Sequence, residues 1–280
     1  MRTFDSTEMT FHSQKNYTDA LQALIDDIKQ GLLLWRSWSI LALMEVKRRY
    51  RRSVLGQFWL TLSMAVTIAG IGITFSVIFG QTTSSYIPFL GVGLIIWGLI
   101  SGLVNDLAIA FISSETYLRS YPGPRSFVIY GTIAKNIIMA GHNLLLVPFL
   151  WLIFQIPLNW ATLLVIPGLA LIIINSVWIG MVIGPLSTRF RDLPSLITSF
   201  MQLLFFLTPI MFRPAQIQEH LWVLTHANPF ASLIEITRGP LLGVVPDAYH
   251  YWVTLLVTVA GFAIAIPFYA RFRGRIVYWL

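Results

Sequence analysis

The sequence predicts an all-α integral membrane protein with six transmembrane helices. Hydrophobic residues make up 56% of the 280 residues, and charged residues make up only 11%. A soluble domain contains about 25% charged residues, so this chain cannot cover a water-facing surface. Uncharged apolar runs of transmembrane length recur along the chain, and basic residues gather at alternate ends of these runs. These two observations together indicate a multi-pass topology.

The first span sets the orientation. Lys47–Arg52 contains five cations in six residues, and the uncharged run Phe58–Phe79 follows it closely. As a helix this run is about 33 Å long, enough to cross a hydrocarbon core of about 30 Å. Because Lys and Arg beside a span resist translocation, the basic end is expected to be cytoplasmic.

The region before this span is expected to lie on the cytoplasmic side. Residues 1–30 are polar, with a helix predicted at 18–29 and no pattern of a cleaved signal peptide. Residues 31–56 are interpreted as an amphipathic interface helix and the basic junction, and an ordinary soluble helix is the alternative. The apolar positions step by three or four, as a helix requires, at Trp35, Trp38, Ala42 and Val46.

Residues 57–270 are predicted to form the six-span transmembrane domain, and residues 271–280 a cytoplasmic tail. After the first span, the expected spans cover about 87–113, 127–154, 161–186, 193–212 and 251–270. Gly98 with Gly102, and Gly180 with Gly184, have the spacing that lets helices approach closely. On this topology sixteen Lys and Arg residues lie inside and two outside, which favours cytoplasmic termini.

The segment 213–250 is expected on the outer side, yet it is too apolar for a plain loop. Pro229, Pro240 and Pro246 divide it into short pieces. Short re-entrant helices in the outer leaflet, between spans five and six, fit this pattern better. They would either seal the bundle or close a pathway.

Enzymatic chemistry has little support in the sequence. The chain has no cysteine, and none of its four lysines follows a glycine, so a Walker-type phosphate loop is absent. The five histidines show no metal-ligand spacing, so no catalytic residue, metal site or cofactor is expected in this chain. The net charge of +7 lies at the ends of apolar runs, which indicates topology control and contact with anionic lipid rather than nucleic acid.

A series of short motifs resembles the membrane subunits of type 2 ABC exporters of polysaccharides, above all O-antigen export permeases of the Wzm kind. The resemblance covers about residues 32–280, and it departs from the family pattern at Gly123 and Thr208. The motifs, in order, are Arg49-Tyr50-Arg51-Arg52-Ser53-Val54-Leu55-Gly56, Tyr121-Pro122-Gly123-Pro124-Arg125, Arg189-Phe190-Arg191-Asp192-Leu193, Phe205-Phe206-Leu207-Thr208-Pro209-Ile210, Asn228-Pro229, Arg238-Gly239-Pro240-Leu241-Leu242-Gly243 and Arg275-Ile276-Val277-Tyr278-Trp279-Leu280.

The resemblance implies a permease that pairs with a second copy of itself and with two separate ATPase subunits, which bind ATP and Mg. Its cargo would be a polysaccharide on undecaprenyl pyrophosphate, moved across the bacterial inner membrane. The first and fifth spans form the pore in this family. Alternatively, any one of the aromatic residues on these spans packs inside the bundle or faces lipid. The aromatic candidates for the pore are Phe58, Trp59, Phe75, Phe79, Phe200, Phe205 and Phe206.

Two groups of charged residues are assigned further roles by hypothesis. The inner loop 114–126 is expected to dock on the ATPase through Glu115, Arg119 and Arg125, or else to be a solvated loop. The lipid-pyrophosphate site is expected at Arg49, Arg51 and Arg52, because guanidinium groups bind phosphate in a fork. Alternatively, these arginines serve only to set the orientation of the chain in the membrane.

Two charges lie inside predicted spans. Asp106 comes seven residues before Ser113, and Lys135 comes eight residues after Phe127, so both lie about 11–12 Å from the inner boundary of antiparallel helices. We predict an intramembrane ion pair, direct or bridged by Asn105 or Asn136, because an unpaired charge in a span is costly. Otherwise Lys135 would extend inward and Asp106 would face an aqueous pathway.

The sequence is also compatible with functions other than O-antigen export. An exporter of a capsule or teichoic-acid polymer is the nearest alternative, followed by an exporter of small lipids or drugs. An ion-coupled secondary transporter would need ionisable residues at mid-membrane, for which Asp106, Lys135 and His142 are the candidates. It would also favour an internal repeat, and the sequence shows none.

Overall fold

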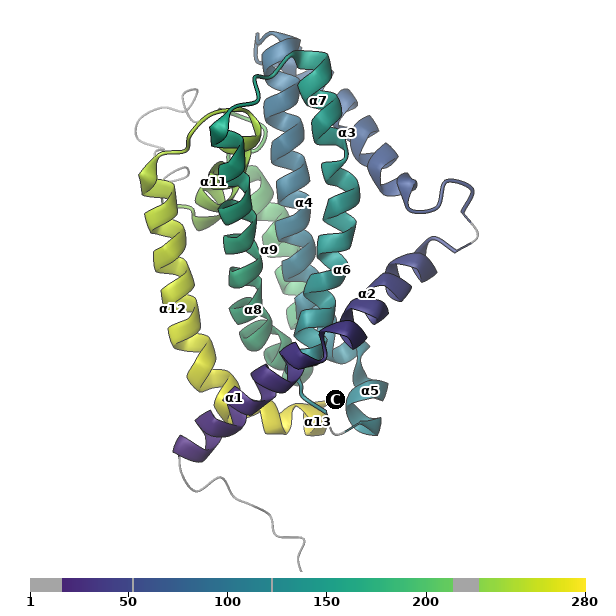
Figure 1. Cartoon of the computed structure of the whole chain (residues 1–280), viewed down its shortest axis with the longest axis vertical. Helices are drawn as coiled ribbons and strands as arrows, with labels where there is room; N and C mark the ends of the chain where they lie inside the picture. Colours follow the sequence, from purple (N-terminus) through teal and green to yellow (C-terminus); the bar gives the residue numbers. More distant parts are fainter. Residues whose placement is uncertain (1–16, 52, 122, 214–226) are drawn as a thin grey trace, which may run out of the picture.

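The computed structural model describes residues 17–51, 53–121, 123–213 and 227–280, and all regular secondary structure in these ranges is helical. The long helices run side by side, and the chain enters along an oblique arm made of α1 and α2 (Figure 1). The elements are α1 (Tyr17–Leu33), α2 (Trp35–Arg49), α3 (Phe58–Ile78), α4 (Thr83–Ser113), α5 (Glu115–Ser120), α6 (Ser126–Leu144), α7 (Leu146–Phe154), η1 (Trp160–Leu164), α8 (Val165–Arg189), α9 (Leu193–Leu207), α11 (Pro229–Leu241), α12 (Ala248–Phe272), η4 (Arg273–Arg275) and α13 (Ile276–Trp279).

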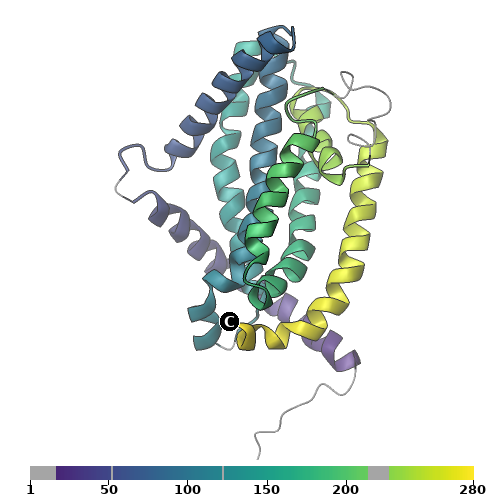
Figure 2. The ribbon, with the colours of Figure 1, turned by 180° about the vertical axis from the view of Figure 1, so that it is seen from behind.

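Helix α4 is the centre of the bundle. It packs against α3, α6, α8, α9 and α11, and the views from the front and from behind both place it among these neighbours (Figures 1 and 2). In its most apolar stretch 78% of the residues are buried, against 17% in α3. A helix that is apolar on all sides is suited to this surrounded position.

Small residues bring α8 close to α4, as their spacing predicted. A Cβ atom at Gly184 would lie 2.6 Å from the ring of Phe111, and one at Gly180 would lie 2.9 Å from Leu107. Such distances are too short for real contacts, so a side chain at Gly184 would displace the Phe111 ring, and one at Gly180 would require the Leu107 side chain to move. The prediction of close approach at this pair is therefore confirmed.

Among the described residues, five helical segments are long and apolar enough to cross a membrane. These are Phe58–Ile78, Thr83–Ser113, Ser126–Phe154, Trp160–Arg189 and Ala248–Trp279. The predicted span over 193–212 is instead the 15-residue helix α9, which ends at Leu207. Fifteen residues reach about 22 Å, less than a hydrocarbon core of about 30 Å. The helix ends early because Thr208 has extended backbone and Pro209 has no N–H group.

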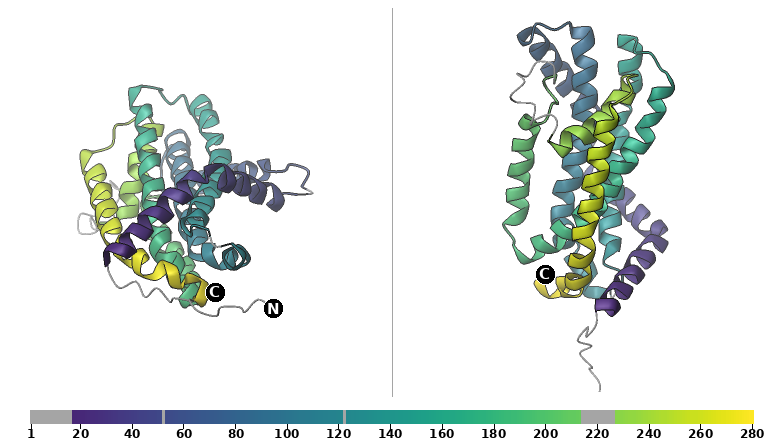
Figure 3. Two further views of the ribbon diagram at one scale, coloured as in Figure 1. Left: turned by 60° about the horizontal axis from the view of Figure 1, so that its bottom comes forward. Right: turned by 90° about the vertical axis from the view of Figure 1, so that its left-hand side faces the viewer.

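The oblique arm contacts the bundle at one end. Helix α1 packs on α6 and α12, and α2 packs on α6; α5 and α13 lie at the same end of the bundle, here called the α5 end (Figures 1 and 3). Ala42 and Val46 of α2 are buried and Trp38 is half-buried, but Trp35 is exposed. The helix predicted at 18–29 is present as the longer helix α1, and α2 lies within the segment predicted as the interface helix and basic junction.

The predicted tail, residues 271–280, is folded against the bundle rather than free. Helix α12 continues to Phe272, and α13 turns under the α5 end (Figure 1). Ile276 is fully buried, and the Trp279 ring lies 5.8 Å from that of Phe272. Arg191 Nη2 donates a hydrogen bond of 2.9 Å to the carbonyl of Leu280.

The opposite end of the bundle, here called the α11 end, holds a short packed helix. Asn228 caps α11 by accepting a hydrogen bond from the N–H of Phe230, and Pro229 occupies the first turn. Helix α11 packs against α4, α8 and α12, and its residues from Ala231 to Leu241 are almost all buried. The predicted segment 213–250 thus contains a short helix, and residues 214–226 of it lie outside the described residues.

Candidate functional site

A groove lies between α4 and α9 and combines aromatic with polar side chains. Its volume is about 420 Å³. Thr198 Oγ1 donates to Asn105 Oδ1 at 2.9 Å, and Gln202 is exposed one turn further along α9. Exposed amide and hydroxyl groups in an apolar helix are costly against lipid, so this face is suited to water or to a polar cargo. The lining residues are Trp97, Ser101, Asn105, Thr198, Met201, Gln202, Phe205 and Phe206.

Of the aromatic residues predicted on α9, Phe205 and Phe206 line this groove and Phe200 does not. Phe205 is half-buried, with its ring 6.0 Å from that of Trp97 and 5.3 Å from that of Phe206. Phe206 and Phe200 are exposed. Sequence reasoning missed Trp97, Asn105 and the other α4 side chains of the groove as pore candidates, since only proximity to α9 identifies them.

The aromatic residues predicted on α3 form a separate set. Phe75 and Phe79 contact each other, with 5.6 Å between their ring centroids, and Phe79 also contacts Tyr86. Phe58 and Trp59, at the other end of α3, are exposed. In the described part of the chain no ring contact joins an α3 aromatic residue to one on α9, so a single copy does not bring the two predicted sets together.

The predicted coupling loop contains the helix α5, whose charged residues face solvent. Arg119 Nε donates to Glu115 Oε1 at 2.8 Å, and both side chains are about half exposed. Tyr117 stacks on Phe127 with 5.0 Å between ring centroids. Burial raises the pKa of Tyr117, Tyr121 adds to this shift, and Arg125 opposes it. The segment is therefore an ordered surface helix with one aromatic anchor.

Asp27 of α1 holds the end of this loop. Its carboxylate accepts the backbone N–H of Arg125 at 2.8 Å and that of Ser126 at 3.0 Å, so it caps α6 from another helix. Arg273 Nη1 lies 3.4 Å from the same carboxylate. The Arg125 guanidinium donates to the carbonyl of Gly123 at 2.9 Å, so this residue is partly used within the chain. No local signal in the sequence identified Asp27.

Asp106 and Lys135 lie side by side inside the bundle. Lys135 Nζ is 3.0 Å from Asp106 Oδ2, and Asn136 Nδ2 donates to the same oxygen at 2.9 Å. Glu45 of α2 is 3.8 Å from Lys135 Nζ on the other side. A Cβ at Gly102 would lie 2.7 Å from Asn136 Oδ1, so this glycine makes room for the Asn136 amide. The predicted pair is present in its direct form; Asn136 supports Asp106 without bridging to Lys135, and the contact with Glu45 is additional.

The arginines of the basic junction are open to solvent. Arg49 and Arg51 are exposed, and Arg52 lies outside the described residues. Arg49 lines a cavity of about 220 Å³ together with Glu45, Arg48 and Lys135. The structure thus leaves the first two arginines accessible to a phosphate group.

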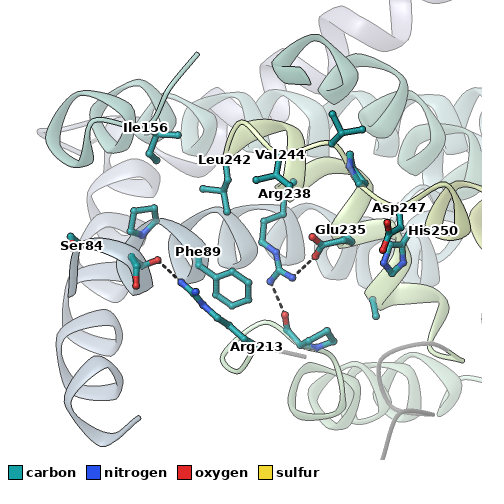
Figure 4. A pocket seen from close by; sticks show the side chains of 17 residues that line it. Ser84, Phe89, Ile156, Arg213, Glu235, Arg238, Leu242, Val244, Asp247 and His250 are labelled. Atoms are coloured by element: carbon teal, nitrogen blue, oxygen red, sulfur yellow. Dashed lines mark hydrogen bonds and ion pairs between the residues drawn. The ribbon is translucent and has the colours of Figure 1, made fainter. Parts of the chain in front are cut away.

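A cavity of about 730 Å³ opens at the α11 end (Figure 4). Arg213 and Arg238 point toward Phe89, with guanidinium carbons 5.1 and 3.9 Å from the ring centroid. Arg238 is 1% exposed; it donates to the Pro209 carbonyl at 2.7 Å and is paired with Glu235. Arg238 lies in the segment 213–250 that was expected on the outer side, but it is a buried residue that joins α11 to α4 and to the end of α9.

The described residues contain no group of three or more His, Cys, Asp or Glu side chains arranged to hold a metal ion. The polar groups of the groove are amides and hydroxyls, which recognise cargo by hydrogen bonding and are poor nucleophiles without an activating base. The arrangement is therefore suited to binding and passage.

Comparison with known families decides the class of the protein. Residues 36–242 match the model of the membrane domain of ABC-2 type transporters. The chain belongs to this ABC-2 transporter family. In this ABC-2 permease the match begins at the start of α2 and ends directly after α11, so every predicted site residue lies within it. Asp27 and Arg273 lie outside.

Several relatives of this ABC-2 permease have a specific name. Two proteins of Klebsiella pneumoniae, each named O-antigen export system permease protein RfbA, are 26% identical over 235 residues, covering 79% of this chain and 87% of theirs. A protein of the same name from Myxococcus xanthus is 24% identical over 195 residues, covering 68% of this chain and 74% of its own.

Proposed function

We propose that this chain is the membrane-spanning permease subunit of an ATP-driven exporter of an O-antigen-type polysaccharide. The observation that carries the proposal is the similarity to three O-antigen export permeases over 68–79% of the chain. The cargo would be a polymer on undecaprenyl pyrophosphate, carried across the bacterial inner membrane. The groove between α4 and α9 supports this role, because aromatic faces and amides are the groups that contact sugars without binding them tightly.

The proposed assembly contains two copies of this chain and two ATPase subunits that bind ATP and Mg. In a dimer the aromatic residues of α3 and α9 from both copies would line one passage. In the proposed six-span topology the crossing that begins with α9 is completed by residues after Leu207, and both termini are cytoplasmic. The location of α1 and α13 at one end of the bundle supports termini on a common side (Figure 1).

The principal test is export in the organism that carries this gene. Deletion should remove the polysaccharide from the cell surface and leave lipid-linked polymer inside, and the wild-type gene should restore export. Phe206→Ala should restore it poorly, whereas Phe149→Ala, an exposed aromatic residue on α7, should restore it fully. Unchanged surface polymer after deletion would refute the proposal, and the chemical identity of the trapped polymer separates O-antigen from capsule or teichoic acid.

Energy coupling is proposed at α5. Glu115 and Arg119 pair with each other, so exchanging them, Glu115→Arg with Arg119→Glu, keeps an intrahelical pair and reverses the charge pattern on the surface. Export and polymer-stimulated ATP hydrolysis should both fall while membrane insertion is unchanged. Full export by the exchanged variant would rule out α5 as the ATPase contact.

Recognition of the lipid pyrophosphate is proposed at Arg49, Arg51 and Arg52. Fork-shaped guanidinium groups suit phosphate, and each cation beside a membrane contributes about 1 kcal/mol of attraction to anionic head groups. Replacing Arg51 and Arg52 by Gln should lower export without changing topology, measured by cysteine labelling at introduced sites. If export is unaffected, these charges serve only in insertion.

An ion-coupled secondary transporter is a weaker candidate. Asp106 and Lys135 are paired with each other rather than presented singly to a pathway. A transported ion or proton would have to displace that pairing.

A further inference from the structure

A cavity of about 470 Å³ lies beside the Asp106–Lys135 pair at the α5 end of the bundle. Its walls come from α2, α4, α5 and α6, so it separates the oblique arm from the transmembrane helices. Its lining combines charged with aromatic side chains: Glu45, Asp106 and Lys135 are charged, and Trp38, Tyr117 and Phe127 are aromatic. Neither the pore nor the ATPase contact proposed above uses this cavity.

The charged part of the lining has an excess of negative charge. Asp106 already accepts a hydrogen bond from Asn136 and is paired with Lys135. Glu45 is different, because its polar partner in the described part of the chain is Lys135 Nζ at 3.8 Å, beyond hydrogen-bond distance. Its carboxylate is half exposed and can accept several N–H donors. The cavity is therefore suited to a cation that donates hydrogen bonds.

The aromatic part of the lining selects an organic cation over a metal ion. The ring of Tyr117 stacks on that of Phe127, with 23° between their planes, and Trp38 is held by a hydrogen bond from its Nε1 to the Gly31 carbonyl. Fixed aromatic faces attract ammonium groups through the ring quadrupole. In the described part of the chain no three His, Cys, Asp or Glu side chains are grouped so that they could hold a metal ion, and this cavity offers only two carboxylates.

A phosphate-sized cavity adjoins the first. It has a volume of about 220 Å³, shares Glu45 and Lys135 with the larger cavity, and is lined by Arg48 and Arg49 of α2. Guanidinium groups are good phosphate ligands. An ammonium site and a phosphate site therefore lie on two sides of the same Glu45–Lys135 contact, which is the charge pattern of a zwitterionic head group.

The depth of the site agrees with the head-group region of a bilayer. Helix α4 has 31 residues and is about 46 Å long, so it exceeds a hydrocarbon core of about 30 Å by roughly 8 Å at each end. Asp106 lies seven residues, or about 10 Å, before the end of α4. With α4 centred on the bilayer, Asp106 is therefore about 2 Å inside the hydrocarbon boundary, which is shallower than the depth predicted from the ends of the apolar runs. Ile40, Leu43 and Met44, on the same helix as Glu45, are exposed and can contact acyl chains.

We propose that these two cavities bind one phospholipid with a primary ammonium head group, of the phosphoethanolamine class. The ammonium group faces Glu45 and the aromatic walls, and the phosphate faces Arg48 and Arg49. A polyisoprenyl pyrophosphate has no ammonium group and matches only the arginine cavity. The bound lipid fills the space between α2 and α6 and joins the oblique arm to the bundle. The site acts independently of which polymer the permease exports.

The test is native mass spectrometry of the purified permease in detergent, titrated separately with dioleoyl phosphatidylethanolamine, phosphatidylglycerol and phosphatidylcholine. The wild-type protein should retain the ethanolamine lipid about fivefold better than either other lipid. A partly exposed ion pair contributes at most about 1 kcal/mol, and that free energy corresponds to about fivefold in affinity. Glu45→Gln should abolish this preference. Asp19→Asn, which removes an exposed carboxylate at the far end of α1, should keep it. The double variant Arg48→Gln with Arg49→Gln should retain all three lipids less.

Three results would overturn the proposal. The first is equal retention of the three lipids by the wild-type protein. The second is a preference for ethanolamine lipid that survives Glu45→Gln in a protein with unchanged unfolding temperature. The third is stronger retention of geranylgeranyl pyrophosphate than of the ethanolamine lipid, which would assign the site to a pyrophosphate carrier. Arg49 also belongs to the pyrophosphate site proposed above, so the third result would favour that site over the ethanolamine lipid. Failure of polysaccharide export in cells would not affect any of these binding measurements.

Discussion

Replacing Asp27 by alanine should detach α1 and the coupling segment from the start of α6. The Asp27 carboxylate is 4% exposed and accepts two backbone N–H groups, those of Arg125 and Ser126. Hydrogen bonds to a charged group contribute about 1.5–3 kcal/mol each, and an N-cap alone contributes about 0.5–2 kcal/mol. Arg125 is partly exposed, so water can replace some of its lost bond.

We therefore expect the free energy of unfolding to fall by about 2–4 kcal/mol. The Arg273 guanidinium contributes little of this, because its Nη1 lies 3.4 Å from the Asp27 carboxylate. For a chain of this size that loss corresponds to roughly 5–10 °C in unfolding temperature. Thermal unfolding of the purified permease in detergent measures it directly. The matched control is Asp26→Ala, which removes an exposed carboxylate one residue away. If both variants unfold within about 1 °C of each other, the capping role assigned to Asp27 is wrong.

Three further predictions concern the bundle. Asp106→Asn and Lys135→Gln should each lower protein stability, and the double variant should recover at least about 1 kcal/mol of the summed loss in a double-mutant cycle, whereas strict additivity would count against the pair. Gly184→Ala should destabilise by about 1–3 kcal/mol because its Cβ meets an α4 ring, while Gly141→Ala, with open space at its Cβ, should be neutral or stabilising; equal effects would contradict close helix packing. Arg238→Gln should cost about 2–4 kcal/mol, since it leaves a carboxylate and a buried carbonyl without their donor, and a loss below about 1 kcal/mol would show that water replaces it.

The long spans were predictable because hydropathy acts locally. An uncharged run such as Phe58–Phe79 has few conformations other than a helix in a membrane, whatever its neighbours are. The Asp106–Lys135 contact was predictable for a related reason. The two residues lie in α4 and α6, which belong to successive membrane spans, so the depth of each could be counted from the end of its helix.

The end of α9 and the burial of Arg238 were not predictable in the same way. The apolar run continues past Leu207, so composition alone extends the span to residue 212, while the backbone leaves the helix at Thr208. Arg238 has a loop-like sequence context, with proline and glycine beside it. It is stable inside the bundle because Phe89, the Pro209 carbonyl and Glu235 surround its guanidinium group.

The sequence by itself determined the class of the protein, its helical architecture and the side chains that must find partners inside the membrane, because burial of apolar surface and the cost of a lone charge depend on residue type and depth. Only the tertiary structure decided which distant segments meet. Asp27 caps a helix that begins 99 residues later, and Glu45 reaches Lys135 from the oblique arm. Such contacts carry no periodic signal, since each consists of one polar side chain whose partner is chosen by the packing of whole helices.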